Sequence, residues 1–129
     1  MTTARDADDY LSKAQESLAS AEADVDAGRY NSCANRCYYA CFQAALAALV
    51  RAGAVSSQAK HEHDFVHSAF ALLIIRRRLY PVSLRSSLPR LLATRQEADY
   101  RTTMVSNAGA RRCISSAREF VTTVTSRVT

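Results

Sequence analysis

The segment from about Tyr30 to Ala52 constrains the fold most strongly, because its apolar side chains cover most of a helical circumference. A helix that is apolar on so many sides is typical of the centre of a helical bundle. The chain has 129 residues with only 3 Gly and 2 Pro, and much of its hydrophobic content is alanine. This composition is typical of helices that approach one another closely. We therefore predict an all-α, up-and-down bundle of about five helices, which forms a single domain over residues 1–129.

Polar side chains interrupt this apolar segment at its middle, in the sequence Asn35-Arg36-Cys37-Tyr38-Tyr39-Ala40. A buried charge must be paired, and a buried phenol must find a hydrogen-bond partner. We therefore predict a structural polar cluster inside the helical core. The residues of this predicted cluster are Arg36, Tyr38, Tyr39 and His63. An acid of the first helix, such as Glu16 or Glu22, is the expected partner of Arg36.

Hydrophobic periodicity and helix-terminating residues predict the remaining helices. The five predicted ranges are 4–26, 30–52, 59–78, 83–100 and 107–127. Gly28 and Gly53 are expected to end the first two helices, and Ser106 is expected to cap the last. Pro89 lies inside the fourth range, so it either kinks that helix or marks a later start capped by Ser87.

Charge is divided unevenly along the chain. Residues 1–75 carry six Lys and Arg against nine Asp and Glu, whereas residues 76–129 carry eleven Arg against three acids. A basic half of this kind is typical of a protein with an anionic partner, either nucleic acid or an acidic protein surface. Arginines that merely coat solvent-facing helix sides would give the same count. The run 76–78 also matches the negative end of the dipole of the helix that it closes.

The sequence predicts no cofactor and no metal site. The cysteines have no CxxC spacing, and we expect them to be buried, reduced thiols. They are Cys33, Cys37, Cys41 and Cys113. His63 and His67 lie four residues apart, downstream of His61 and Glu62, which is a spacing that two metal ligands can use. Asp64 follows the first of this pair, where a zinc protease needs glutamate, and no third ligand is evident.

Membrane contact is not expected either. The longest unbroken apolar run, 69–75, is far too short to span a bilayer. The N-terminal residues lack the apolar core of a signal peptide. We therefore predict a cytoplasmic protein.

An ordered set of short motifs remains to be interpreted. These motifs are Gly28-Arg29-Tyr30, residues 35–42, His63 with Val66 and Phe70, Arg95 with Ala98-Asp99-Tyr100, and residues 117–121. Together they cover almost the whole chain, and they resemble the HEPN domain. More narrowly, the chain is similar to the small stand-alone prokaryotic HEPN proteins of the UPF0332 type.

The resemblance implies a helical bundle that is usually a homodimer and is often encoded beside a minimal nucleotidyltransferase as a toxin–antitoxin pair. Catalytically active members are metal-independent ribonucleases, whose motif is an arginine followed after four to six residues by a histidine. The arginine stabilises charge on the phosphorane, and the histidine moves a proton. In related toxins a nearby tyrosine is nucleotidylated by the partner, and Tyr100 is the analogous residue here.

This sequence departs from that motif, because the positions counted from Arg95 hold Tyr100, Arg101 and Thr102. The missing histidine favours a module that binds RNA or a partner protein over an enzyme. The expected binding residues are Arg95, Asp99, Tyr100 and Arg101. Three alternatives remain open at this point. One is a divergent ribonuclease that uses Arg95 with Asp99 or Tyr100 across a dimer, another is a structural dimer held by arginines, and the third is a simple intrahelical ion pair between Arg95 and Asp99.

Overall fold

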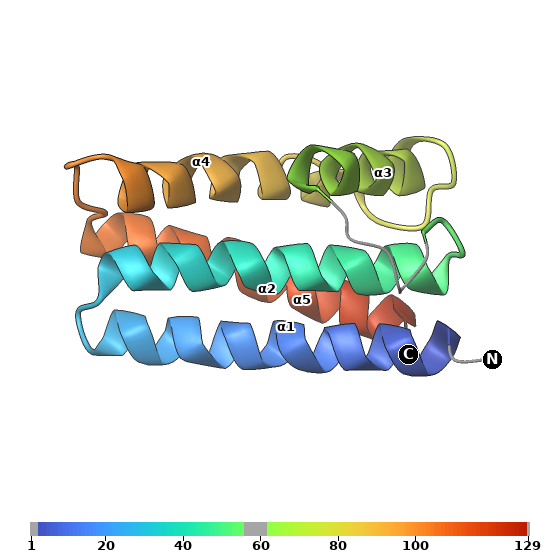
Figure 1. Ribbon diagram of the computed structural model, residues 1–129, viewed down its shortest axis with the longest axis horizontal. Helices are drawn as coiled ribbons and strands as arrows, with labels where there is room; N and C mark the ends of the chain where they lie inside the picture. The colour runs from blue at the N-terminus through green and yellow to red at the C-terminus, as the bar shows by residue number, and fades with distance from the viewer. Residues whose placement is uncertain (1–2, 56–61, 129) are drawn as a thin grey trace.

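The computed structural model describes residues 3–55 and 62–128, and these residues form the predicted all-α bundle (Figure 1). The five α-helices of the described residues are α1 (Thr3–Asp26), α2 (Tyr30–Arg51), α3 (His63–Ile75), α4 (Ser87–Tyr100) and α5 (Asn107–Val128). A short 3-10 helix, η1 (Val82–Leu84), lies between α3 and α4. His61 and the first residues of the third predicted helix lie outside the described residues. None of the described helices is long and apolar enough to cross a membrane.

Helix α2 is the centre of the bundle, as its apolar circumference predicts. It contacts α1, α3, α4 and α5, and its buried residues extend along its whole length. Figure 1 shows α1 antiparallel to α2 on one side, α3 and α4 on the other side, and α5 behind α2. This arrangement covers the apolar faces of α2 within one chain.

Two glycines end the first two helices, as predicted, and both have positive φ. Gly28 has φ +79° and Gly53 has φ +71°. The amide of Gly28 donates to Val25 O, and the amide of the next residue donates to Asp24 O at 2.8 Å. The same pair of hydrogen bonds surrounds Gly53. This is the Schellman arrangement, which satisfies the last helical carbonyls and needs a residue that tolerates the left-handed region.

Alanine is the most frequent buried residue, and larger aliphatic and aromatic side chains complete the core. Eleven alanines are buried, so α1, α2 and α5 approach one another closely. Aromatic contacts join α3 to α5 and to the turn after α3. The ring of Phe70 lies 5.0 Å from that of Phe120 and 5.2 Å from that of Tyr80, measured between centroids. Phe70 is therefore the main anchor of α3.

The third and fourth predicted helices are longer than the structure allows. Helix α3 ends at Ile75, so the arginine run 76–78 follows the helix, and Arg78 has a left-handed φ of 51°. Helix α4 begins at Ser87 rather than Ser83, and Pro89 is its third residue. Proline is tolerated in the first turn, where its missing N–H has no helical acceptor. The later start is therefore correct, although Ser87 lies inside the helix rather than capping it.

The cap of the last helix agrees with the prediction. Ser106 Oγ accepts a hydrogen bond from the amide of Gly109 at 3.0 Å, and Ser106 O accepts from the amide of Ala110 at 2.9 Å. The loop before this cap is tied to the start of α2, because Asn31 Oδ1 accepts from the amide of Val105 at 2.9 Å. The loop between α4 and α5 is thereby fixed against α2.

Candidate functional site

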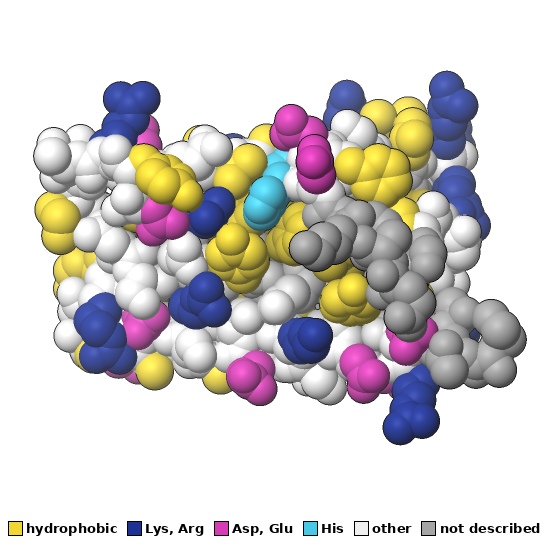
Figure 2. Space-filling model, viewed as in Figure 1, with side chains coloured by type: hydrophobic (Ala, Val, Ile, Leu, Met, Phe, Trp, Pro, Cys, Tyr) yellow, Lys and Arg dark blue, Asp and Glu magenta, His cyan; other side chains and the backbone are white. Residues whose placement is uncertain are grey.

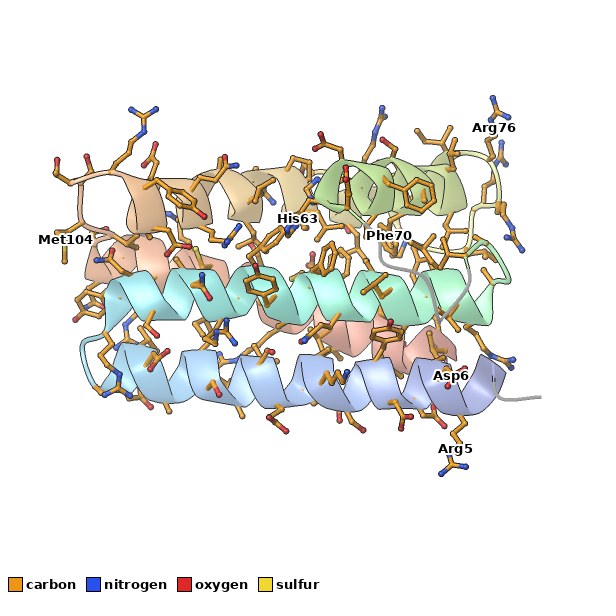
Figure 3. All side chains as sticks on the ribbon, in the orientation of Figure 1. Arg5, Asp6, His63, Phe70, Arg76 and Met104 are labelled. Atoms are coloured by element: carbon orange, nitrogen blue, oxygen red, sulfur yellow. The ribbon has the colours of Figure 1, made fainter. Side chains whose placement is uncertain are left out.

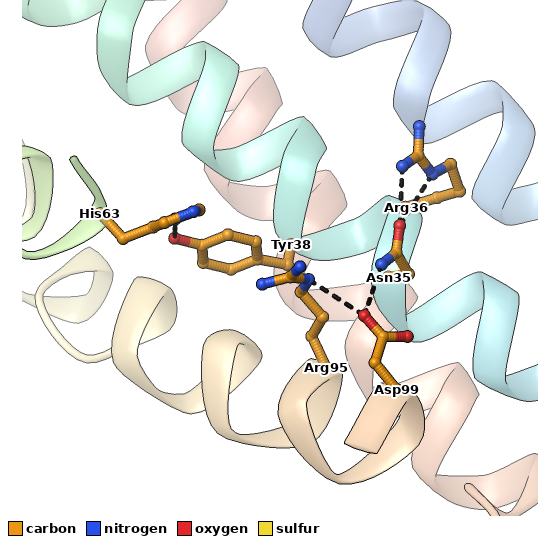
Figure 4. Close-up of polar contacts among 6 residues, drawn as sticks. All are labelled: Asn35, Arg36, Tyr38, His63, Arg95 and Asp99. Atoms are coloured by element: carbon orange, nitrogen blue, oxygen red, sulfur yellow. Dashed lines mark hydrogen bonds and ion pairs between the residues drawn. The ribbon is translucent and has the colours of Figure 1, made fainter. Parts of the chain in front are cut away.

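A polar cluster lies between α2, α3 and α4, and the hydroxyl of Tyr38 is at its centre (Figure 4). This hydroxyl lies 2.5 Å from Nδ1 of His63 and 2.9 Å from Nε2 of His67. A phenol has one proton to donate and can also accept. The Tyr38 hydroxyl therefore donates to one ring, which is neutral, and accepts the N–H of the other.

The surroundings of the two imidazoles favour the same neutral state. Burial lowers the pKa of His63, and the positive charge of Arg95 lowers it further, while Asp64 opposes both effects. Burial also lowers the pKa of His67, with a second contribution from His63. Burial raises the pKa of the Tyr38 phenol well above its usual range, mainly by desolvation. All three groups are therefore uncharged near neutral pH.

Arg95 is the cation of this cluster. Its guanidinium carbon lies 5.1 Å from the ring centroid of Tyr39 and 5.8 Å from that of Tyr38. Its Nε lies 3.3 Å from Asp99 Oδ2, so the ion pair that the four-residue spacing predicts is present. The same Oδ2 accepts a hydrogen bond from Asn35 Nδ2 at 2.9 Å. The Arg95 side chain is only 14% exposed, and its Nε is buried without a hydrogen-bond partner.

The predicted role of Arg36 is wrong. Its Nε and terminal nitrogen donate to Asn35 Oδ1, and its guanidinium lies over the Tyr39 ring at 5.2 Å. Glu22, one of its two expected partners, instead accepts a hydrogen bond from Arg118 at 2.7 Å. Arg36 is only partly buried, so it has no need of a carboxylate on α1. The buried cation that the sequence placed on α2 comes from α4 instead.

The fold brings together residues that sequence spacing could not connect. Arg95 and His63 both contact Tyr38, although 32 positions separate them in the chain. Sequence reasoning gave no role to Asn35 and treated His67 only as a metal ligand. The available signal for Asn35 was its place one turn before Tyr38 and Tyr39 on a helix whose residues are mostly apolar.

The end of α4 presents the remaining predicted binding residues to solvent. Tyr100 is 74% exposed, and Arg101 is also exposed. Beside them, a groove of about 370 Å³ runs between α4 and α5, with Arg90, Glu97 and Arg112 among its lining residues. Tyr100 and Arg101 therefore do not join the Tyr38 cluster, but they follow Arg95 and Asp99 on the same helix.

The thiols and histidines form no metal site in the part of the chain that the structure describes. All four cysteines are free and buried, as predicted. Burial raises the pKa of Cys41 and Cys113, which keeps these thiols protonated. No group of three His, Cys, Asp or Glu side chains converges among the described residues.

These features define the class of protein as a small all-α bundle with an arginine–tyrosine–histidine cluster between its central helix and two covering helices. A family model for the HEPN domain matches residues 7–127, and the chain therefore belongs to the HEPN domain family. No curated protein matches the chain.

Proposed function

We propose that this HEPN domain is a partner-binding module of a prokaryotic toxin–antitoxin-like system, of the UPF0332 type, which works with a nucleotidyltransferase and holds RNA. The observation that carries the proposal is the position of Arg95. Its guanidinium is held on two tyrosine faces beside Asp99, and it is followed on the same helix by the exposed Tyr100 and Arg101. Stacked arginines and exposed aromatic side chains are the groups that bind phosphates and unpaired bases.

The state of the histidines supports a binding module. Both imidazoles contact the Tyr38 hydroxyl, and none of the residues that follow Arg95 at the motif spacing is a histidine. Asp99 is occupied by Asn35 and Arg95. The groups that would move a proton are therefore engaged in holding the cluster together.

A metal-independent ribonuclease is the second candidate, and one observation favours it. The fold places His63 in the same cluster as Arg95, so an arginine and a neutral imidazole are close in space without the sequence motif. A neutral imidazole accepts a proton near neutral pH, and an arginine stabilises developing negative charge. In this case His63, rather than Asp99 or Tyr100, is the base.

Cleavage of RNA in the presence of a chelator separates the two candidates. The binding module predicts no cleavage by the wild-type protein at concentrations where related toxins degrade RNA. Cleavage that is lost in both Arg95→Met and His63→Gln would instead establish the ribonuclease. Methionine is chosen at position 95 because it retains most of the packing against the two tyrosine rings.

RNA affinity gives the first quantitative test of Arg95. We expect Arg95→Met to weaken binding of a labelled single-stranded RNA by about three- to tenfold and to lower the salt dependence, because one phosphate contact is lost. Fluorescence anisotropy at several salt concentrations measures both quantities. Arg118→Met is the matched control, since Arg118 is exposed and pairs with Glu22 on another face. Equal losses in the two variants, or an affinity that does not depend on salt, would contradict RNA binding at Arg95.

Modification of Tyr100 is the second test. After co-expression with the neighbouring nucleotidyltransferase, we expect the intact mass to increase by one nucleotide, because this phenol is exposed at the end of α4. Tyr100→Phe should abolish the increase, and Tyr30→Phe should retain it, since Tyr30 is partly buried at the start of α2. An unmodified protein, with the partner active on other substrates, would remove this part of the proposal.

We include a homodimer in the proposal on the basis of the family resemblance alone. The apolar faces of α2 are covered by other helices of the same chain, so they give no separate reason to expect a dimer.

A further inference from the structure

Exposed apolar side chains gather at the opposite end of the upper layer from Tyr100. Ile75 is 49% exposed at the end of α3, and Val82 is 75% exposed at the start of η1. Leu72 and Leu79 are also exposed. Isolated exposed apolar residues are ordinary, but several within one short stretch form a patch that is typical of an interaction site. Figure 2 shows hydrophobic side chains beside Lys and Arg side chains at this end of the molecule, where Figure 3 labels Arg76.

The patch contains a hollow of about 450 Å³. We call it the α3–η1 hollow and define it by Ile75, Arg78, Tyr80, Pro81, Val82 and Arg85, which are among its lining residues. The lining is mostly apolar, and an arginine lies on each side of the proline turn. Tyr80 is buried and stacks on Phe70, so one wall of the hollow is fixed to the core. A fixed apolar hollow beside two cations is suited to one apolar side chain with carboxylates next to it.

The charge around the hollow has a single sign. Residues 65–96 contain six arginines and no aspartate or glutamate. Within the described part of the chain, no carboxylate forms an ion pair with Arg78 or Arg85, whereas Arg29, Arg95 and Arg118 each have one. Both hollow arginines are exposed. A partner that covers this patch must therefore supply the negative charge itself.

We propose that the α3–η1 hollow docks a segment of a partner protein in which one apolar residue is flanked by aspartate or glutamate. The apolar residue enters between Ile75 and Val82, and the flanking carboxylates pair with Arg78 and Arg85. A protein segment fits better than a lipid surface, because the site is a hollow with one arginine on each side rather than a flat, broad apolar face. This inference goes beyond the function proposed above, because that function rests on residues 95–101, whereas the α3–η1 hollow is a separate surface to which it assigns no partner.

A designed peptide tests the inference on the full-length protein. The probe is a synthetic peptide with one leucine flanked on both sides by two glutamates, added to ¹⁵N-labelled protein up to about 1 mM, a concentration that detects weak binding. We expect saturable shifts of the backbone amides of residues 74–85. Two control peptides replace the leucine by serine or the glutamates by lysines, and each should bind at least about tenfold more weakly.

Substitutions on the protein complete the test. The double variant Arg78→Gln and Arg85→Gln should weaken binding of the peptide by about tenfold or more, and Val82→Ser should have an effect of the same size. Arg90→Gln is the matched control, because Arg90 is an exposed arginine outside the hollow and should leave the affinity unchanged. Each variant alters exposed side chains, and an unchanged melting temperature verifies its fold. Titration of the same samples with RNA reports on residues 95–101 separately, so that failure of one proposal leaves the other measurable.

Four results would overturn the inference. They are the absence of saturable shifts, equal binding of the lysine peptide, shifts confined to residues outside 74–85, and stronger binding to vesicles of phosphatidylglycerol and phosphatidylcholine than to the peptide. Self-association through this surface, seen as a doubled mass in light scattering that Val82→Ser abolishes, would also overturn it in favour of a second copy of the chain.

Discussion

Replacing Phe70 by alanine is expected to lower the free energy of unfolding by about 3 to 5 kcal/mol, which is the usual cost of removing a large aromatic side chain from a packed core. Phe70 is 2% exposed and stacks on both Phe120 and Tyr80. The contacts join α3 to α5 and to the turn after α3. The small side chains around the resulting cavity are too short to fill it, so the cavity could close only if a helix moved.

Urea denaturation measures this loss, and Leu72→Ala is the control on the same helix. Leu72 is exposed, so we expect its truncation to change the stability by no more than about 0.5 kcal/mol. A loss below about 1 kcal/mol in Phe70→Ala would show that α3 is not anchored as described. Because α3 has only 13 residues, it depends on tertiary packing for its helical structure. We therefore also expect faster hydrogen exchange in α3 of the Phe70 variant.

Stability is expected to fall as the pH is lowered below about 6.5, the ordinary pKa of histidine. The folded pKa values of His63 and His67 are both lowered, chiefly by burial. The unfolded chain therefore binds protons at these rings before the folded chain does. Protons thus stabilise the unfolded state, and the contribution of the neutral rings is complete above pH 6.5 and is lost below it.

The size of this effect has an upper limit of about 1.4 kcal/mol per pH unit for each ring. Both rings are partly exposed, so solvent screening keeps the measured slope below that limit. The hydrogen bonds of the Tyr38 hydroxyl also limit how many of the two rings can be protonated in the folded state. One ring can take a proton and still donate to the phenol oxygen, but when both are charged the hydroxyl proton loses its acceptor.

Thermal or urea denaturation between pH 7.5 and pH 5 measures the slope. The double variant His63→Gln and His67→Gln removes both titrating groups, so its stability should depend less on pH than that of the wild type in this range. Subtracting the two curves cancels the carboxylates common to both proteins. A wild-type curve parallel to that of the double variant would contradict the lowered pKa values.

The sequence predicted the helices best where a glycine ends them. Gly28 and Gly53 tolerate the left-handed conformation that closes a helix, so the ends of α1 and α2 lie within one residue of their predicted positions. Helix α3 ends without a glycine, because Arg78 adopts the left-handed conformation instead. Side chains other than glycine carry a steric cost there, and no residue preference marks such an end in advance.

The polar cluster was predicted only in part, because periodicity within one helix does not show which residues of other helices it meets. Helical periodicity placed Tyr38 on the buried side of α2 and indicated that its hydroxyl needs a partner. It could not identify the cation, since the choice between Arg36 and Arg95 depends on how α4 packs across α2. Such a contact joins residues distant in sequence, and the spacing within one helix carries no information about it.

The alanines at the centre of the bundle have a consequence for conformational entropy. An alanine side chain has no rotamers to lose on burial, whereas each buried leucine or isoleucine gives up about 0.5 to 1 kcal/mol of rotamer freedom. Eleven of the 34 buried apolar residues that the structure describes are alanines, so about a third of these residues are ordered without a side-chain entropy cost. Each alanine also removes little apolar area from water. The favourable part of the balance therefore rests on the larger buried side chains, and Tyr38, Phe70 and Phe120 are the largest of those that are almost completely buried.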